Sequence, residues 1–540
     1  MKIINPVIKG FNPDPSFLRV GTDYYIANST FQWFPGVQIH HSKDLINWEL
    51  VERPLNSKRL LDMTGIPDSG GVWAPDLTYS DGKFWLVFSN VKSMRGAFKD
   101  TPNFLITAES IHGPWSDPIF LNSNGFDASL FHAPDGRKYL LNMVWDQRNY
   151  LHQFHGIQLR EYSPEKKSLV GEPQIIWNGT ADKITEGPHL YYINNNYYLF
   201  CAQGGTNWPH QEVVARSENL LGKYEVEPGD PLLTAMNTPH NYLQKCGHGS
   251  LIETQNHEWY LAHLMARPLH HPNESLIEPR GWSPLGRETS IEKIYWDEQG
   301  WPHIVGGNAG SKEVIAPTFV KQSSSIAKQT KIENFSQDKL GIEFNTLRLP
   351  AKKVGVSLTD KPGKLRLYGR ESMSSLFNVA FVARRWQAFS FDAETAVNYH
   401  PTSYQQMAGV ANYYDSTNYT AAYVTFNESV GRCIEVLSCD AEDFTFYLKE
   451  QAISIPDNVD SVYFRTKVRK ESYNYAYSFD GETWVDIPIN FDSLKLSDDY
   501  ILMKYGGYAF FTGAFTGMFS SDLTGGKLPA DFDYFKYCEL

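Results

Sequence analysis

Aromatic and aliphatic residues in the first three hundred positions recur with a long, regular period. Five times, a polar turn leads into one or two aromatic residues and then into an aliphatic residue. A fixed period without helical periodicity indicates a repeated unit of short strands. The last aromatic residue of each instance is Tyr25, Trp85, Tyr139, Tyr198 or Tyr260, so the spacings are 60, 54, 59 and 62 residues.

Each of these aromatic positions follows a turn, and each turn follows another short strand. The middle turns are Ser80-Asp81-Gly82, Pro134-Asp135-Gly136 and Asn194-Asn195-Asn196, which are typical of antiparallel hairpins. The strand before each turn opens with a short polar tag. The five tags are Asn12-Pro13-Asp14-Pro15-Ser16, Trp73-Ala74-Pro75-Asp76-Leu77, Phe126-Asp127-Ala128-Ser129-Leu130, Glu186-Gly187-Pro188-His189-Leu190 and Gly247-His248-Gly249-Ser250-Leu251.

Five such units predict an all-β fold in which residues 1–310 form a five-bladed β-propeller. The innermost strand of every blade surrounds the central axis. Because the tags open these strands, side chains from different blades are expected to converge at one end of the central channel. Asp14, Asp127, Glu186 and His248 would come from four blades and still face one another.

The pattern changes near residue 305. Glycines at 306–310 and the polar run Gln322-Ser323-Ser324-Ser325 indicate a connection, which we place at residues 311–332. Alternating strands then return, as in Tyr475-Ala476-Tyr477-Ser478. Residues 333–540 are therefore predicted to form an antiparallel β-sandwich. The glycine-rich segment 506–515 would present aromatic rings either to the propeller or to the core of the sandwich.

Asp14, Asp127 and Glu186 occupy equivalent starts of three blades. Each has a structural explanation, since Asp14 precedes a proline, Asp127 could cap a strand edge and Glu186 could pair with Lys183. Structural repetition alone, however, would favour one residue type in every tag. The different chemistry of the tags indicates specialisation around an axis. Two carboxyl groups with separated pKa values are sufficient to hydrolyse a glycosidic bond.

His248, between Gly247 and Gly249, has two interpretations that the sequence leaves open. It is either a structural residue or a residue that points into the channel and holds water or an ion. In the second case it is our candidate metal ligand, for a divalent cation such as calcium in the propeller channel. We expect that no cofactor is required.

Composition excludes several classes of function. The formal charge of -12, without a clustered basic face, disfavours a nucleic-acid partner. No basic amphipathic run suggests a membrane surface, and no apolar stretch approaches the length of a membrane span. The N-terminus lacks the pattern of a secretory signal. The five cysteines are scattered, which favours free thiols in a reducing compartment, so we expect a cytoplasmic protein. Aromatic residues, 14% of the chain, suit an all-β core, and a few could suit the C–H faces of sugars.

The first four tags, taken in order, resemble those of glycoside hydrolase family 43, in particular its two-domain β-xylosidases. The resemblance extends from Asn5 to the end of the chain. It implies a five-bladed propeller followed by a β-sandwich of the jelly-roll, concanavalin-like type. It also implies that Asp14 is the general base, that Glu186 is the general acid, and that Asp127 orients Glu186 and keeps its pKa high.

The same resemblance implies the other residues of the site. An aromatic loop of the second domain would close the pocket, and a closed pocket admits a chain end, so we expect exo action. Which ring of that loop reaches the substrate stays open. The substrate-binding candidates are Phe31, Trp73, Trp145, Thr206, Arg287, Phe510 and Phe511, and we add His248.

The expected function is release of D-xylose from the non-reducing ends of β-1,4-xylooligosaccharides by an inverting homo-oligomeric enzyme, with α-L-arabinofuranosidase side activity. Asp14 and Glu186 come from the first and fourth blades, which favours the separation of roughly 6.5–9.5 Å that inverting enzymes need. The alternatives are an α-L-arabinofuranosidase or an arabinan-degrading enzyme. A non-catalytic sugar-binding protein would have no use for three acids on separate blades. Retaining fructan-cleaving enzymes carry an Asn-Asp-Pro-Asn-Gly tag, which this sequence lacks.

Overall fold

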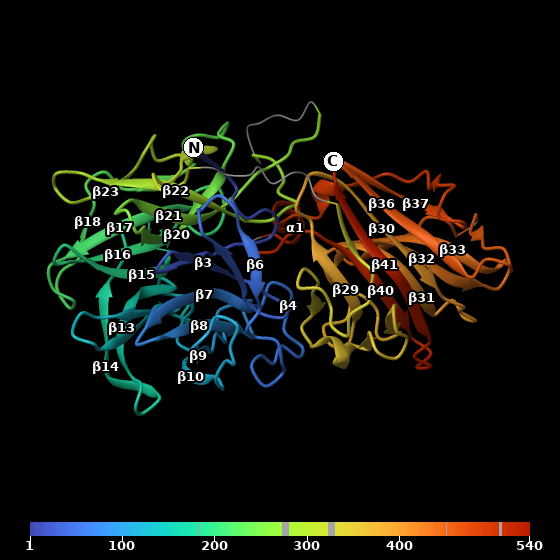
Figure 1. Cartoon of the computed structure of the whole chain (residues 1–540), viewed down its shortest axis with the longest axis horizontal. Coiled ribbons are helices and arrows are strands. Elements are labelled where there is room, and N and C mark those ends of the chain that lie inside the picture. The colour runs from blue at the N-terminus through green and yellow to red at the C-terminus, as the bar shows by residue number, and fades with distance from the viewer. Residues whose placement is uncertain (183, 273–279, 322–329, 450, 507–509) are drawn as a thin grey trace.

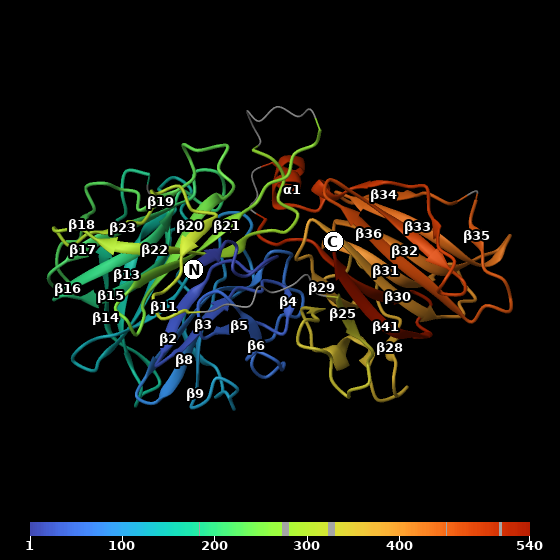
Figure 2. The same cartoon turned by 45° about the horizontal axis from the view of Figure 1, so that its top comes forward.

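Two bodies built from β-strands lie next to each other (Figures 1 and 2). The computed structural model describes residues 1–540 apart from 183, 273–279, 322–329, 450 and 507–509. The N-terminal body runs from blue to yellow-green in Figure 1, and the C-terminal body runs from dark yellow to red. The prediction of an all-β fold is confirmed. Over the described ranges, no helix has the length and hydropathy that a membrane span requires.

The N-terminal body is the predicted five-bladed β-propeller. Four main antiparallel strands form each blade, and the first strands of adjacent blades contact one another around the axis. The repeated aromatic residues all lie in the second strand of their blade, which confirms the period. The blades contain β2 (Ser16–Val20), β3 (Asp23–Asn28), β5 (Gln38–Ser42) and β6 (Glu49–Glu52); β7 (Gly71–Ser80), β8 (Lys83–Val91), β9 (Asn103–Ala108) and β10 (Ile119–Asn122); β11 (Ser129–His132), β12 (Lys138–Trp145), β13 (Phe154–Ser163) and β14 (Ser168–Trp177); β15 (Thr185–Ile193), β16 (Asn196–Gln203), β17 (Gln211–Ser217), β18 (Glu225–Val226) and β19 (Leu233–Thr234); and β20 (Gln244–Glu253), β21 (Trp259–Ala266), β22 (Glu288–Trp296) and β23 (Pro302–Ile304).

One residue in every tag adopts the left-handed backbone conformation, which costs a non-glycine residue about 1–3 kcal/mol. The bend interrupts pairing in the inner strands β7, β15 and β20. The side chains of residues at the bend, or just before it, form the wall at one end of the channel. The side chains of residues after the bend form the wall of a hollow farther along the channel. The bent residues are Asp14 (φ 51°), Ala74 (φ 23°), Asp127 (φ 53°), Gly187 (φ 58°) and His248 (φ 56°).

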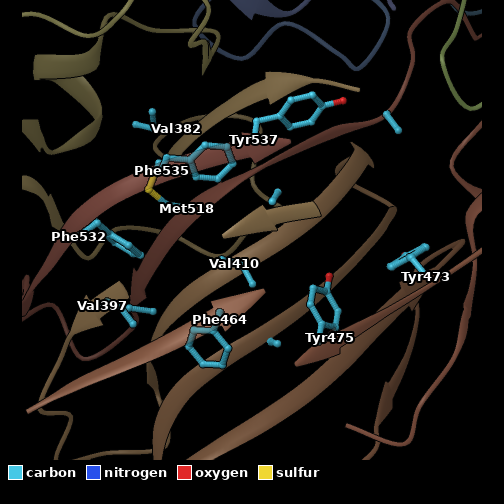
Figure 3. Close-up of a cluster of buried hydrophobic side chains, with 14 of the residues drawn as sticks. Val382, Val397, Val410, Phe464, Tyr473, Tyr475, Met518, Phe532, Phe535 and Tyr537 are labelled. Atoms are coloured by element: carbon cyan, nitrogen blue, oxygen red, sulfur yellow. The ribbon is translucent and has the colours of Figure 1, made fainter. Parts of the chain in front are cut away.

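The C-terminal body is the predicted β-sandwich, made of a nine-stranded and a seven-stranded sheet. In Figure 3, Val410 and Met518 of one sheet lie near Phe464 and Phe532 of the other, inside the buried core. The larger sheet contains β27 (Val356–Ser357), β28 (Leu365–Tyr368), β41 (Pro529–Glu539), β30 (Ser390–Asn398), β36 (Ser461–Arg469), β37 (Ser472–Ser478), β38 (Val485–Asp486), β25 (Thr330–Glu333) and β39 (Phe491–Asp492). The smaller sheet contains β29 (Ala380–Arg385), β40 (Phe515–Asp522), β31 (Gln406–Asp415), β32 (Asn418–Asn427), β33 (Gly431–Asp440), β34 (Asp443–Phe446) and β35 (Ile453–Ser454). Short helices are η1 (Ala351–Val354), η2 (Ser493–Lys495) and α1 (Asp498–Tyr505).

Three short strand pairs connect the bodies and the segment between them. β1 (Lys2–Ile4) pairs with β24 (Glu313–Ile315), so the start of the expected linker belongs to the propeller. At the other end of the expected linker, β25 pairs with β41 of the sandwich. Between the bodies, β4 (Trp33–Phe34) pairs with β26 (Thr346–Leu347). The backbone itself therefore links the propeller to the sandwich.

Buried side chains reinforce this interface. Trp33 of the propeller is fully buried and stacks on Phe515 of the sandwich, with ring centroids 3.6 Å apart and planes at 14°. Arg348, also buried, donates a hydrogen bond of 2.6 Å to Asp68 across the same interface. Apolar stacking and a buried ion pair thus fix the position of the sandwich relative to the propeller.

Replacing Trp33 with alanine is expected to lower the free energy of unfolding by about 3–5 kcal/mol, because the ring leaves a cavity at the interface. Urea unfolding followed by circular dichroism measures the change. Trp48→Ala is the control, since Trp48 is only partly buried and packs on Phe17 within the propeller. A loss for Trp33→Ala no larger than that for the control would contradict the interface described above.

Candidate active site

A small pocket opens at the end of the propeller channel. Every blade contributes to its wall, and Phe511 of the sandwich contributes as well. The structure brings together most of the residues that the sequence nominated. The lining residues are Asp14, Phe31, Trp73, Phe126, Asp127, Glu186, Thr206, His210, His248, Leu264, Arg287 and Phe511.

Asp14 is held in one orientation from two sides. The Ser29 hydroxyl donates to Oδ2 of Asp14 at 2.6 Å, and Nη1 of Arg287 donates to Oδ1 at 3.0 Å. Nδ1 of His248 lies 3.7 Å from the same Oδ1 atom. Only 5% of Asp14 is exposed, so its carboxylate faces the pocket and little bulk water.

Glu186 has the pKa of a group that can donate a proton near neutral pH. Desolvation in the pocket and the Asp14 carboxylate raise the pKa of Glu186 to about 7, against the opposing charges of Arg287 and Lys99. A carboxyl group with this pKa is still largely protonated at mildly acidic pH. Glu186 can therefore act as an acid in the pocket that it shares with Asp14.

Asp127 is buried, and its pKa is raised well above the usual value by desolvation and then by the charges of Glu186 and Asp14. The backbone N–H of Gly187 donates to its carboxyl group. The two carboxyl groups therefore interact, since the charge of Glu186 disfavours ionisation of Asp127. That Asp127 in turn keeps the pKa of Glu186 high stays a prediction. Asp127 contacts the chain at the residue after Glu186, which suits an orienting role.

Arg287 connects three parts of the pocket. Its Nη1 atom donates to Asp14 and, at 3.0 Å, to the Thr206 hydroxyl. Its Nη2 atom donates to the carbonyl of Phe511 at 3.1 Å, so one guanidinium joins the propeller to the sandwich loop. The fork of donors on a planar guanidinium suits this arrangement better than a lysine ammonium would.

Aromatic rings form the remaining wall. Phe511 lies 5.8 Å from Phe31 and 5.3 Å from Trp73, measured between ring centroids. Its backbone N–H donates to the Ser69 hydroxyl at 3.2 Å, which ties the sandwich loop to the propeller. Phe510 instead packs in the sandwich core, 5.8 Å from the ring of Tyr505. Of these two adjacent rings, Phe511 is therefore the one that reaches the pocket, and Tyr508 of the same loop lies outside the described residues.

His248 lies in the pocket wall with only 6% of its surface exposed. Burial lowers its pKa to about 4, so the imidazole is neutral near pH 7. Gly187 lies so close that a Cβ there would be 2.7 Å from Nε2 of His248. Over the described ranges, no group of three or more His, Cys, Asp or Glu side chains could hold a metal ion. A divalent cation beside His248 stays a prediction.

A sequence model described as Glycosyl hydrolases family 43 matches residues 3–302, more than half of the chain. The chain belongs to glycoside hydrolase family 43. A second model, described as the beta xylosidase C-terminal concanavalin A-like domain, matches residues 332–538 of this family 43 enzyme. The resemblance drawn from the tags is confirmed.

Several relatives match the family 43 chain over nearly its whole length, and three of them are described here. It is 53% identical over 539 residues to the Beta-xylosidase of Bacillus subtilis (strain 168), with 100% of both chains covered. It is 43% identical to Xylosidase/arabinosidase 43B of Humicola insolens, covering 99% of this chain and 97% of the relative. The crystal structure of xylan beta-1,4-xylosidase from Bacillus halodurans C-125, 45% identical, gives a TM-score of 0.94 over 99% of this chain and 100% of that one.

Trp145 of the family 43 enzyme lies behind the pocket wall and does not line it. Its ring is 6.2 Å from that of Phe126, and its indole N–H donates to the Ala97 carbonyl at 2.8 Å. Nζ of Lys99 lies 4.4 Å from the centre of the Trp145 ring and donates to the Met94 carbonyl at 2.8 Å. This lysine is the second cation that acts on Glu186, and sequence reasoning did not find it.

Phe126, His210 and Leu264 also line the pocket without having been nominated. Phe126 could have been found, because it directly precedes Asp127 in a tag. His210 and Leu264 lie outside the tags, and only the fold brings them to the channel. Burial lowers the pKa of His210 to about 3, and its Nδ1 atom lies 2.7 Å from the Gly205 carbonyl, which indicates a neutral structural residue.

Replacing Lys99 with methionine is expected to raise the pKa of Glu186, because the ammonium charge favours the ionised carboxylate. Glu186 would then keep its proton to higher pH. The alkaline limb of the pH profile of kcat/KM for a glycoside substrate should move upward by a few tenths of a pH unit.

The matched control is Lys83→Met. Lys83 also lies over a tryptophan ring, 5.5 Å from the centre of Trp85, at the turn end of its strand. Its loss should leave the alkaline limb unchanged. A downward shift for Lys99→Met, or equal shifts for both variants, would contradict the electrostatic assignment.

Proposed function

We propose that this family 43 enzyme is an exo-acting, inverting β-xylosidase that releases D-xylose from the non-reducing ends of β-1,4-xylooligosaccharides. The observation that carries the proposal is one pocket that contains Asp14, fixed by Arg287, and Glu186, with a pKa of about 7. Xylosidase names among its full-length relatives support xylose as the sugar.

The proposed reaction is a single displacement by water. The Asp14 carboxylate accepts a proton from the attacking water while the water oxygen bonds to the anomeric carbon. Glu186 donates its proton to the glycosidic oxygen as the bond from that oxygen to the anomeric carbon breaks. One water is consumed, xylose and a shortened chain leave, and solvent returns the proton from Asp14 to Glu186. Attack on the face opposite the leaving group inverts the configuration.

The other pocket residues would bind and orient the terminal sugar. Phe31, Trp73 and Phe511 offer apolar faces to C–H groups, and the guanidinium of Arg287 offers donors to hydroxyls. Phe511 comes from the sandwich and covers the propeller pocket, which supports binding of a chain end over a chain middle. We assign Asp127 the orientation of Glu186, through the N–H of Gly187.

An α-L-arabinofuranosidase activity is the second candidate, as a side activity. A non-reducing arabinofuranose would present hydroxyls and apolar faces of the same kind to a small pocket. The Humicola insolens relative, named xylosidase/arabinosidase, supports this proposal. The ratio of kcat/KM for aryl xyloside and aryl arabinofuranoside substrates would decide which activity is the main one.

Three further properties are proposed. Turnover should need no cofactor, and a cation beside His248 would draw most of its ligands from water or substrate. A cytoplasmic location is supported by the cysteines, since all five are free. We also propose a homo-oligomer, which sedimentation velocity would test.

Asp14→Ala and Glu186→Ala are expected to lose activity in different ways. Without the base, turnover of xylobiose and of aryl xylosides should fall together, because both need an activated water. Without the acid, xylobiose hydrolysis should fall by roughly 100-fold or more. An aryl xyloside with a good leaving group should lose much less, since its leaving oxygen needs little protonation.

Steady-state kinetics on both substrates, with circular dichroism to check folding, measures the difference. Phe510→Ala serves as a control on the same loop, because Phe510 packs in the sandwich core and not in the pocket. Equal losses on both substrates for Glu186→Ala would contradict its role as the acid. Absence of xylose release by the unaltered enzyme would reject the proposed function itself.

A further inference from the structure

A band of polar contacts surrounds the channel just beyond the left-handed bends. Each blade contributes the residue two positions after its bent residue. These five equivalent residues are Ser16, Asp76, Ser129, His189 and Ser250, and each is at most 9% exposed. Asp76, Ser129, His189 and Ser250 line a hollow in the channel that is separate from the sugar pocket, and Ser16 lies beside that hollow. None of the five residues lines the sugar pocket.

Asp76 contacts all three strands that carry the pocket carboxyl groups. Its Oδ1 atom accepts a hydrogen bond of 3.0 Å from the Ser16 hydroxyl, two residues after Asp14. Its Oδ2 atom accepts one of 2.8 Å from the backbone N–H of Leu130, three residues after Asp127.

The third contact of Asp76 reaches the strand of Glu186. Nδ1 of His189, three residues after Glu186, lies 3.5 Å from Oδ1 of Asp76. Blade two, which carries none of the three pocket carboxyl groups, thus supplies one carboxyl group in contact with the strands of blades one, three and four. An aspartate can accept hydrogen bonds on both oxygens, whereas an asparagine has one acceptor oxygen and one donor nitrogen.

Other hydrogen bonds close the band around the axis. The Ser129 hydroxyl donates to the carbonyl of Pro188, which joins blades three and four. The N–H of Leu251 donates to the Tyr191 hydroxyl at 2.8 Å, which joins blades four and five. The N–H of Phe17 donates to the Ser250 hydroxyl at 2.9 Å, which joins blades five and one. Displacement of one inner strand along the channel would therefore disturb its neighbours.

We propose that Asp76 is a positioning residue that sets the relative placement of Asp14, Asp127 and Glu186 through Ser16, Leu130 and His189. It acts through the strands and does not touch the sugar. Because an acid and a base must both be in reach of the reacting atoms, a small shift of one strand reduces the rate. The proposal rests on the proposed glycosidase function.

Asp76→Asn tests the assignment with almost no change in volume. The variant is expected to lower kcat for xylobiose on the order of 10- to 100-fold, with KM changed much less, because binding groups stay in place while acid and base lose their alignment. The loss should be smaller for an aryl xyloside with a good leaving group. A residue that only stabilised the fold would lower the melting temperature and leave kcat of the folded protein unchanged.

Thr78→Val is the matched control. Thr78 lies on the same strand, and its hydroxyl shares a hydrogen bond of 2.8 Å with His132 of blade three, outside the band around Asp76. Its loss removes a contact between blades but should leave kcat unchanged. Ser16→Ala is a milder second variant, which removes one of the three contacts of Asp76 and should lower kcat several-fold.

Unchanged kcat in folded Asp76→Asn, or equal losses for Asp76→Asn and Thr78→Val, would overturn the proposal while leaving the function intact. If Asp76→Asn does not fold, unchanged kcat in Ser16→Ala would overturn it instead. A loss in Ser16→Ala without one in Thr78→Val would support it. Failure of the unaltered enzyme to cleave xylobiose would reject the proposed function itself, and with it the role of Asp76 that rests on that function.

Discussion

Asp14, Asp127 and Glu186 share one small pocket with the guanidinium of Arg287. Three carboxyl groups cannot all be charged in such a space, because desolvation and mutual repulsion both favour protonation. Arg287 donates a hydrogen bond to Asp14, whereas burial raises the pKa values of Glu186 and Asp127. Three like side chains thus have different surroundings, which suit the proposed roles of base, acid and orienting group.

The two domains contribute to this arrangement in different ways. The propeller brings residues from distant parts of the sequence to one end of a channel, and the same left-handed bend at each blade start presents them there. The sandwich contributes Phe511 and, through its carbonyl, a contact with Arg287. Since Arg287 also holds Asp14, closure of the pocket and orientation of the Asp14 carboxyl group are physically connected. The buried stack of Trp33 on Phe515 keeps the loop of Phe511 in position.

Much of this could be predicted from the sequence, because a repeat of about sixty residues determines both the number of blades and the places where tags converge. The period predicted that Asp14, Asp127, Glu186 and His248 would meet. Contacts between side chains of different blades leave no periodic signal. Phe510 and Phe511 are adjacent and chemically alike, and only packing shows that the first enters the sandwich core. Trp145 lies one layer behind the pocket, and Lys99 and His210 reach their places through loops whose course the sequence does not determine.

The central claim is that Asp14 and Glu186 act on opposite faces of the sugar in a single displacement. Proton NMR of β-linked xylobiose hydrolysis, recorded before mutarotation, tests this most directly. The account predicts that the xylose released from the non-reducing unit appears first as the α anomer. First appearance of β-xylose from that unit would contradict it, because retention requires a covalent intermediate on a carboxylate and a second displacement.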